Sequence, residues 1–178
     1  MTASQLFSAL VLMVCHTGFA FGQPDWTTPI WRRIRGDWPD TTNQIRSMIS
    51  VDEELFIGTA GTVAYSAQVW KLDDASVIEH AQFPQLKVAV LEADRAGNLY
   101  VGVGTPHSAE GTGTGDAEVW KIDAHRESTR LKAFHGRDFA YSMAWFQGRL
   151  HVGTMTEDLP GTAEVWRFDD PGWSRIAG

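Results

Sequence analysis

Short apolar runs separated by turn residues are the main pattern of this chain. After residue 22 the runs are rich in Val, Ile, Trp, Tyr and Phe, and Gly, Asp, Asn and Ser stand between them. Such runs are typical of β-strands, and the residues between them are typical of turns. No stretch of 11 or more residues there carries a convincing 3.6-residue apolar period. The pattern therefore predicts an all-β protein.

The sequence also repeats itself three times. Each copy holds a valine, a tryptophan, a basic residue, an apolar residue and an aspartate in a row, at Val69–Asp73, Val119–Asp123 and Val165–Asp169. The three tryptophans stand 50 and then 46 residues apart. A period of this size that holds only short apolar runs is typical of a four-stranded propeller blade. We therefore expect a β-propeller with three four-stranded antiparallel blades, at residues 45–85, 86–138 and 139–178.

The segment before the first blade has the same pattern as the last strand of the third. Trp31–Gly36 reads Trp-Arg-Arg-Ile-Arg-Gly, and Trp173–Gly178 reads Trp-Ser-Arg-Ile-Ala-Gly. Since an N-terminal strand commonly completes the last blade of a propeller, we expect residues 23–44 to carry an orphan outer strand at about 29–36. Three blades cannot close a ring, which needs roughly 4–8. We therefore expect an incomplete ring and favour a truncated chain, with closure between identical chains as the alternative.

The first 22 residues differ from the rest of the chain. Met1–Gly22 holds no Asp, Glu, Lys or Arg, and Leu6–Cys15 is an apolar run broken only by Ser8. Small residues, Ala20 and Gly22, stand where a signal peptidase would need them. We therefore expect a signal peptide that is cleaved after Gly22, a secreted or periplasmic protein, and no stable membrane insertion after cleavage. The run is too short to span a bilayer comfortably.

Charge and cysteine content exclude several classes of function. The formal net charge of −7 argues against nucleic-acid binding, which needs clustered Lys and Arg. The single cysteine, Cys15, lies in the expected signal peptide. A mature chain without cysteine has no disulfide, thiolate metal site or cysteine nucleophile. We expect no cofactor.

Residues that recur in all three copies are expected to be structural. We expect the tryptophans to fill the space between blades rather than to form a platform for sugar rings, at Trp70, Trp120 and Trp166. We expect the aspartates to fix turns by accepting backbone N–H bonds, at Asp73, Asp123 and Asp169. We expect the glycines to relieve crowding or to supply unusual dihedral angles, at Gly58, Gly102 and Gly153. Two residues before each tryptophan stand Gln68, Glu118 and Glu164. The exchange of Gln for Glu predicts a hydrogen-bonding or surface role that does not depend on charge.

Candidate binding residues lie where the copies differ. The link between the second and third strands is longest in the second copy, at Gly104–Asp116, and the equivalent link of the third copy is Met155–Gly161. Loops on a rigid scaffold often carry binding groups. The candidates are His107, Glu110, Asp116, Glu157 and Asp158. The spacing of His107, Glu110 and Asp116 matches no metal-binding motif, so we expect no metal site.

One hairpin carries a family resemblance. Asp94–Gly102 reads Asp-Arg-Ala-Gly-Asn-Leu-Tyr-Val-Gly, which resembles the D-x-x-G-N-L-x-V-G hairpin of two-component-regulator and NHL-type propellers in bacterial extracellular proteins. The full motifs of kelch, WD and Asp-box repeats are absent from the sequence. The resemblance implies a propeller and implies binding of peptides, sugars or partner proteins. Some members of such families are hydrolases or lyases.

The sequence favours a binding module over an enzyme. Propeller hydrolases and lactonases gather carboxylates and histidines on the strands nearest the axis. The expected innermost strands here, at 45–50, 87–91 and 140–145, hold neither residue type. We therefore expect a non-catalytic module whose partner is a small molecule, a glycan or a protein. A fragment of a propeller hydrolase and a purely structural module remain as alternatives.

Overall fold

The computed structural model describes residues 42–73, 76–106, 116–157 and 163–178, and within these ranges it holds twelve β-strands and no helix. The strands are β1 (Thr42–Val51), β2 (Glu54–Gly61), β3 (Ala67–Asp73), β4 (Ser76–Phe83), β5 (Lys87–Ala93), β6 (Leu99–Gly104), β7 (Ala117–Ile122), β8 (Ser128–Phe134), β9 (Phe139–Phe146), β10 (Arg149–Met155), β11 (Glu164–Asp169) and β12 (Gly172–Ala177). Among the described residues, no helix is long and apolar enough to cross a membrane. The expected signal peptide and the expected orphan strand at 29–36 lie outside these residues.

The all-β prediction is confirmed, and the strands fall into three groups. Within each group every strand pairs antiparallel with the next one along the chain: β1–β4 form group one, β5–β8 group two and β9–β12 group three. A single pair of strand residues joins each group to the next. Ala60 pairs with Lys87 between groups one and two, and Gly104 pairs with Phe139 between groups two and three. The result is one twelve-stranded antiparallel sheet that does not close on itself.

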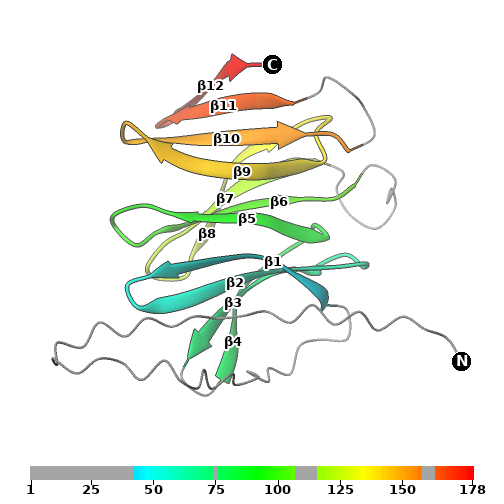
Figure 1. Cartoon of the computed structure of the whole chain (residues 1–178), viewed down its shortest axis with the longest axis vertical. Helices are drawn as coiled ribbons and strands as arrows, with labels where there is room; N and C mark the ends of the chain where they lie inside the picture. Colours follow the sequence, from blue (N-terminus) through cyan, green and yellow to red (C-terminus); the bar gives the residue numbers. More distant parts are fainter. Residues whose placement is uncertain (1–41, 74–75, 107–115, 158–162) are drawn as a thin grey trace, which may run out of the picture. The chain divides into compact units, whose positions relative to one another are not determined.

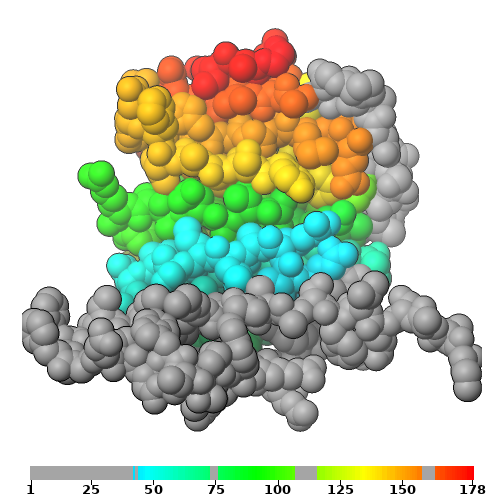
Figure 2. Space-filling view, in the orientation of Figure 1, coloured from blue at the N-terminus to red at the C-terminus, as the bar shows by residue number. Residues whose placement is uncertain are grey.

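The three groups follow one another in space as they do in the sequence. The first strands of the groups, β1, β5 and β9, lie side by side (Figure 1). In the space-filling view the groups form successive layers, from cyan through green and yellow to red (Figure 2). Each group therefore contacts its neighbour along the chain through a face of its own strands.

The strand register repeats from group to group. The tryptophan of each third strand lies opposite an apolar residue of the second strand, in the pairs Ile57 with Trp70, Val101 with Trp120 and Val152 with Trp166. The pairing with the fourth strand shifts at the same place each time, between the repeated valine and the tryptophan. The sequence repeat thus corresponds to a structural repeat, residue for residue.

Two apolar clusters hold the groups together. The first joins Phe56, Val69 and Phe83 of group one to residues of group two that include Val88 and Val101. The second joins Tyr100, Val119 and Phe134 of group two to Ala140, Leu150 and Val152 of group three. Neighbouring residues of a strand point to opposite faces of the sheet. Since group two contributes residues to both clusters, it packs against a neighbouring group on each of its faces. This explains the uninterrupted apolar run of β6, which is buried along its whole length.

Two of the three repeated tryptophans, Trp120 and Trp166, lie at the junctions between groups. The ring of Trp120 contacts that of Phe83, with centroids 5.4 Å apart, and Trp166 contacts Phe134 at 5.5 Å. Phe83 and Phe134 end the fourth strand of the preceding group. Trp120 and Trp166 therefore each pack against a phenylalanine of the preceding group.

The repeated glycines allow two groups to approach closely. A Cβ atom on Gly58 would lie 2.5 Å from the Val88 side chain of group two, and one on Gly102 would lie 2.5 Å from the carbonyl oxygen of Ala140 in group three. Real Cβ contacts are never this short. Crowding therefore favours glycine at both positions: Gly102 is crowded by group three, and Gly58 by Ser47 of its own group as well as by Val88. Neither glycine has a positive φ.

The turns between first and second strands follow the local sequence. Asp52-Glu53 and Gln147-Gly148 form two-residue turns in which both residues have positive φ. The longer turn at 94–98 contains Gly97, at φ +80°, and is closed by Asp94, whose Oδ1 accepts the backbone N–H groups of Ala96 and Asn98 at 2.9 and 3.0 Å. Burial raises the pKa of Asp94, but hydrogen bonds from Asn98 and Ala96 outweigh it and hold that pKa below its usual value. The carboxylate is fully engaged in its own turn.

Replacement of Phe134 by alanine tests the packing between groups two and three. Phe134 is 3% exposed and contacts both Trp166 and Trp173. We expect Phe134→Ala to lower the free energy of unfolding by about 3–5 kcal/mol, because it leaves a cavity at the junction. The matched control is Phe146→Ala, since Phe146 is 62% exposed, and it should cost about 0.5 kcal/mol or less. Equal losses in denaturant unfolding would contradict this packing.

Candidate functional site

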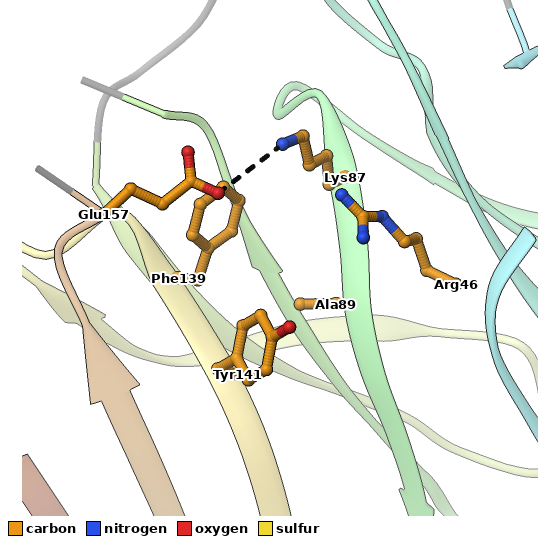
Figure 3. A pocket seen from close by; sticks show the side chains of 6 residues that line it. All are labelled: Arg46, Lys87, Ala89, Phe139, Tyr141 and Glu157. Atoms are coloured by element: carbon orange, nitrogen blue, oxygen red, sulfur yellow. Dashed lines mark ion pairs between the residues drawn. The ribbon is translucent and has the colours of Figure 1, made fainter. Parts of the chain in front are cut away.

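A hollow of about 170 Å³ lies where the first strands of the three groups meet. Figure 3 shows the residues that line it, which are Arg46 of β1, Lys87 and Ala89 of β5, Phe139 and Tyr141 of β9, and Glu157, which follows β10. We call this the bulge hollow. It draws residues from all three groups, so it exists only when the groups pack together.

A β-bulge in each first strand points a residue into the bulge hollow. The register of β1 against β2 skips Arg46, that of β5 against β6 skips Ala89, and that of β9 against β10 skips Tyr141. The three residues therefore occupy the same position in the three groups. The residues before them, Val88 and Ala140 in groups two and three, are fully buried in the junctions. A bulge turns one side chain away from the regular alternation, as often happens beside functional sites.

The bulge hollow holds more positive than negative charge. Arg46 and Lys87 contribute two cations, and Glu157 contributes one carboxylate. The Nζ atom of Lys87 lies 4.0 Å from Oε1 of Glu157 and 4.9 Å from the centroid of the Phe139 ring. Tyr141 is 55% exposed. An acidic protein thus carries a locally basic, partly aromatic hollow.

A buried aspartate holds Glu157 in place. The backbone N–H of Glu157 donates to Oδ2 of Asp138 at 2.8 Å, and Asp138 is 1% exposed. The backbone N–H of Asp138 in turn donates to the carbonyl oxygen of Met155 at 2.9 Å. These bonds join the start of β9 to the end of β10. These hydrogen bonds therefore fix the backbone of Glu157 beside the bulge hollow.

The structure separates the loop residues that the sequence singled out. Glu157 lines the bulge hollow, whereas His107, Glu110 and Asp158 lie outside the described residues. Asp116 lies elsewhere: its Oδ2 is 2.6 Å from Nδ1 of His135, and its Oδ1 accepts the backbone N–H of Gly136 at 3.1 Å. Among the residues that the structure describes, no group of three or more His, Cys, Asp or Glu side chains can hold a metal ion.

Sequence reasoning missed the two cations and the tyrosine of the bulge hollow. Arg46, Lys87 and Tyr141 lie on first strands, where the lack of carboxylates and histidines at 45–50, 87–91 and 140–145 argues only against catalytic groups. The strand β5 also runs on to Ala93, so it includes a carboxylate, Glu92, against our expectation for the innermost strands. Glu92 lines a second and more open hollow beside the turns at 94–98 and 147–148, where Asp94 is already engaged by its own turn. We therefore regard the bulge hollow as the better candidate.

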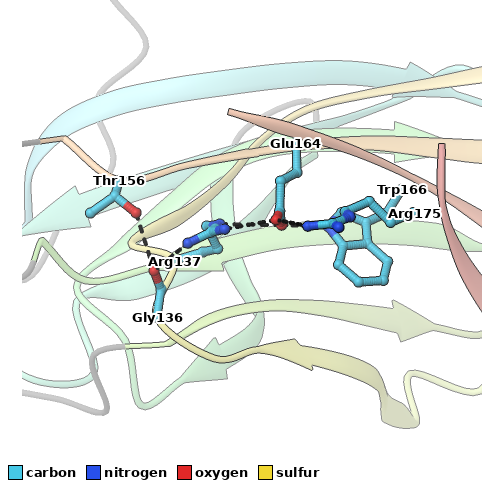
Figure 4. A network of polar contacts seen from close by, with 6 residues as sticks. All are labelled: Gly136, Arg137, Thr156, Glu164, Trp166 and Arg175. Carbon is cyan, nitrogen blue, oxygen red and sulfur yellow. Dashed lines mark hydrogen bonds and ion pairs between the residues drawn. The ribbon is translucent and has the colours of Figure 1, made fainter. Parts of the chain in front are cut away.

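A second polar cluster surrounds Glu164 (Figure 4). Arg137 donates to both of its carboxylate oxygens, at 2.7 and 3.2 Å, and Arg175 and Trp166 Nε1 donate at 2.9 and 3.0 Å. Glu164 is 8% exposed. The hydrogen bonds from Arg137 are the main reason that the pKa of Glu164 falls from its usual 4.5 to about 2. The carboxylate of Glu164 thus has its acceptor positions engaged within the cluster.

The same cluster recurs in the other groups. Glu118 accepts from Arg130 at 2.9 Å, from Trp120 Nε1 at 2.8 Å and from Gln85 at 2.7 Å. In group one the repeated residue donates the hydrogen bond instead of accepting it. The Gln68 amide donates to the Glu79 carboxylate of the fourth strand at 3.0 Å. The expected hydrogen-bonding role is found at all three positions. The expectation of a charge-independent or surface role is wrong for Glu118 and Glu164, which are buried and paired with arginine.

The repeated aspartates differ in their partners. Asp123 Oδ1 accepts the backbone N–H groups of His125 and Glu127, at 2.8 and 3.0 Å. Asp169 instead pairs with Arg149 and Arg167, at 3.1 and 2.8 Å. The side chain of Asp73 lies outside the described part of the chain. Asp123 thus fixes a turn, whereas Asp169 forms ion pairs with two arginines.

The sequence matches no protein-family model and no curated protein. The chemistry of the bulge hollow therefore rests on its geometry.

Glu164 gives a testable dependence of stability on pH. The pKa of Glu164 is about 2 in the folded chain, and its usual value of 4.5 applies to the unfolded chain. As the pH falls, Glu164 is therefore protonated first in the unfolded chain. The contribution of Glu164 to stability is therefore present above pH 4.5 and is lost between about 4.5 and 2. We expect Glu164→Gln to be less stable than the parent at neutral pH and to lose less stability over that window.

The measurement is the free energy of unfolding at a series of pH values. Glu157→Gln is the control, because Glu157 is an exposed glutamate outside the Glu164 cluster, and it should keep the slope of the parent. If Glu164→Gln and the parent have parallel curves, the ion pairs of Glu164 do not stabilise the fold.

Proposed function

We propose that this chain is an exported, non-catalytic module of the β-propeller type that binds an acidic sugar in the bulge hollow. The propeller arrangement is supported by three four-strand groups with one shared register, each packed face to face on the next. The resemblance of the Asp94–Gly102 hairpin to bacterial extracellular propeller repeats points the same way. Export is supported by the signal-peptide pattern of Met1–Gly22.

The observation that carries the binding role is the convergence of equivalent bulge residues on one hollow. Arg46 and Tyr141 reach it from the bulges of β1 and β9, and Lys87 reaches it from the start of β5. A planar guanidinium binds a carboxylate through two parallel hydrogen bonds, and an ammonium adds a second positive charge. The net positive charge of the bulge hollow therefore selects an anion.

The aromatic wall and the size of the hollow favour a sugar ring. An exposed tyrosine ring offers a flat apolar face on which the C–H groups of a sugar can pack. The Glu157 carboxylate accepts hydrogen bonds only, which suits the hydroxyl groups of a sugar. The volume of about 170 Å³ is small beside the roughly 300–1,000 Å³ of sites for drug-sized ligands. It suits one ring, so we assign the site to a single uronate unit at the end or side of a glycan.

Titration with a galacturonate disaccharide and with a neutral galactose disaccharide tests this function. We expect the full chain to bind the acidic sugar and to bind the neutral one at least about tenfold more weakly, because the neutral sugar has no carboxylate to accept hydrogen bonds from Arg46 and Lys87. Arg46→Gln should weaken acidic sugar binding about 10- to 100-fold, since it removes charge-assisted hydrogen bonds. Calorimetry or chemical-shift changes would measure both effects.

The control variant is Arg95→Gln, because Arg95 is an exposed arginine in the turn at 94–98, away from the bulge hollow. It should leave binding of the acidic sugar unchanged. The proposal is overturned if the chain binds neither disaccharide, if both bind equally, or if Arg46→Gln and Arg95→Gln have the same effect.

A further inference from the structure

The loop between β2 and β3 lies at the same end of the strands as the bulge hollow. β2 ends one residue after Ala60, which pairs with Lys87 at the start of β5. The loop, residues 62–66, follows directly. Arg46, the second cation of the hollow, lies on β1, which also pairs with β2. The loop therefore begins beside the strands that carry both cations.

Hydrogen bonds fix the backbone of this loop. The backbone N–H of Tyr65 donates to the carbonyl oxygen of Pro84 at 3.2 Å, and the carbonyl oxygen of Tyr65 accepts from the Gln82 amide at 3.0 Å. The Ser66 hydroxyl donates to the carbonyl oxygen of Val63 at 2.6 Å. Tyr65 is therefore held on both sides of its Cα atom.

The partner of Tyr65 leads directly to the bulge hollow. Pro84 stands three residues before Lys87 in the connection between groups one and two. Three residues span at most about 11 Å. A glycan of a few linked rings can bridge such a distance, so one molecule can occupy the bulge hollow and reach Tyr65.

The backbone at Tyr65 favours glycine, although a tyrosine stands there. Its φ of +64° lies in the left-handed region, which costs free energy for a residue with a bulky side chain. Glycine would adopt this φ without that cost. The tyrosine contributes little to packing in return, because it is 57% exposed. A strained residue that presents an exposed aromatic ring points to a binding role.

We infer that Tyr65 forms a second sugar subsite, on which one ring of a glycan packs while an acidic ring of the same glycan occupies the bulge hollow. This inference rests on the proposed function, because the bulge hollow holds the first ring. An aromatic ring offers an apolar face to the C–H groups of a sugar. Val63, which is 44% exposed, adds apolar surface in the same loop. The ligand is therefore an oligosaccharide with an acidic unit rather than a single sugar.

Calorimetric titration of the full chain with a galacturonate disaccharide and with a galacturonate tetrasaccharide tests this inference. We expect the tetrasaccharide to bind at least about fivefold more tightly, because only the longer chain reaches Tyr65. Tyr65→Gly should remove this gain and leave disaccharide binding unchanged. Tyr65→Asn, a second variant without the ring, should do the same, since asparagine also tolerates the left-handed backbone. Tyr65→Phe should keep the gain, because it keeps the ring.

The control is Phe146→Ala, since Phe146 is 62% exposed and ends β9, the strand that Phe139 of the bulge hollow begins. It should leave the binding of both sugars unchanged. Equal affinity of the parent for the two sugars overturns the inference and leaves the proposed function standing. A gain that persists in Tyr65→Gly and Tyr65→Asn overturns it too, and so does an equal loss of both sugars in these variants. Binding of neither sugar by the parent overturns the proposed function and this inference with it.

Discussion

The contact between a tryptophan of one group and a phenylalanine of the preceding group is the interaction on which the rest of the structure depends. Phe83 with Trp120 and Phe134 with Trp166 form the same tilted ring pair at the two junctions. Such pairs contribute beyond the apolar area that they bury. The first strands come within reach of one another, and so form the bulge hollow, because these rings hold neighbouring groups at a fixed separation.

A buried polar cluster accompanies each ring pair. Glu118 and Glu164 each accept a hydrogen bond from the tryptophan that follows them and from an arginine of the fourth strand. A further donor comes from the connection between two groups, Gln85 in one case and Arg137 in the other. Burial of a carboxylate costs free energy unless the carboxylate is paired. The fold therefore requires the tryptophan, the arginine of the outer strand and the donor of the connection to stay in place around it. The Gln68–Glu79 pair of group one shows that reversed polarity also satisfies this constraint.

The strands were predictable because they follow the two-residue alternation and the sequence repeat. The first strand of group one was expected at 45–50 and extends over Thr42–Val51. The bulge hollow was not predictable in the same way, because Arg46 and Tyr141 reach it through bulges, where alternation fails. A bulge is visible only once two strands are aligned. The loops favoured by sequence reasoning contribute one described residue, Glu157.

The proposed function depends on one claim, that the aromatic pairs at the two junctions hold the groups face to face. Nuclear Overhauser effects between phenylalanine and tryptophan ring protons, in the selectively labelled full chain, measure this most directly. The account predicts cross-peaks between Phe83 and Trp120 and between Phe134 and Trp166, whose ring centroids are 5.4 and 5.5 Å apart. Tryptophan rings that show cross-peaks only to protons of their own group would contradict it.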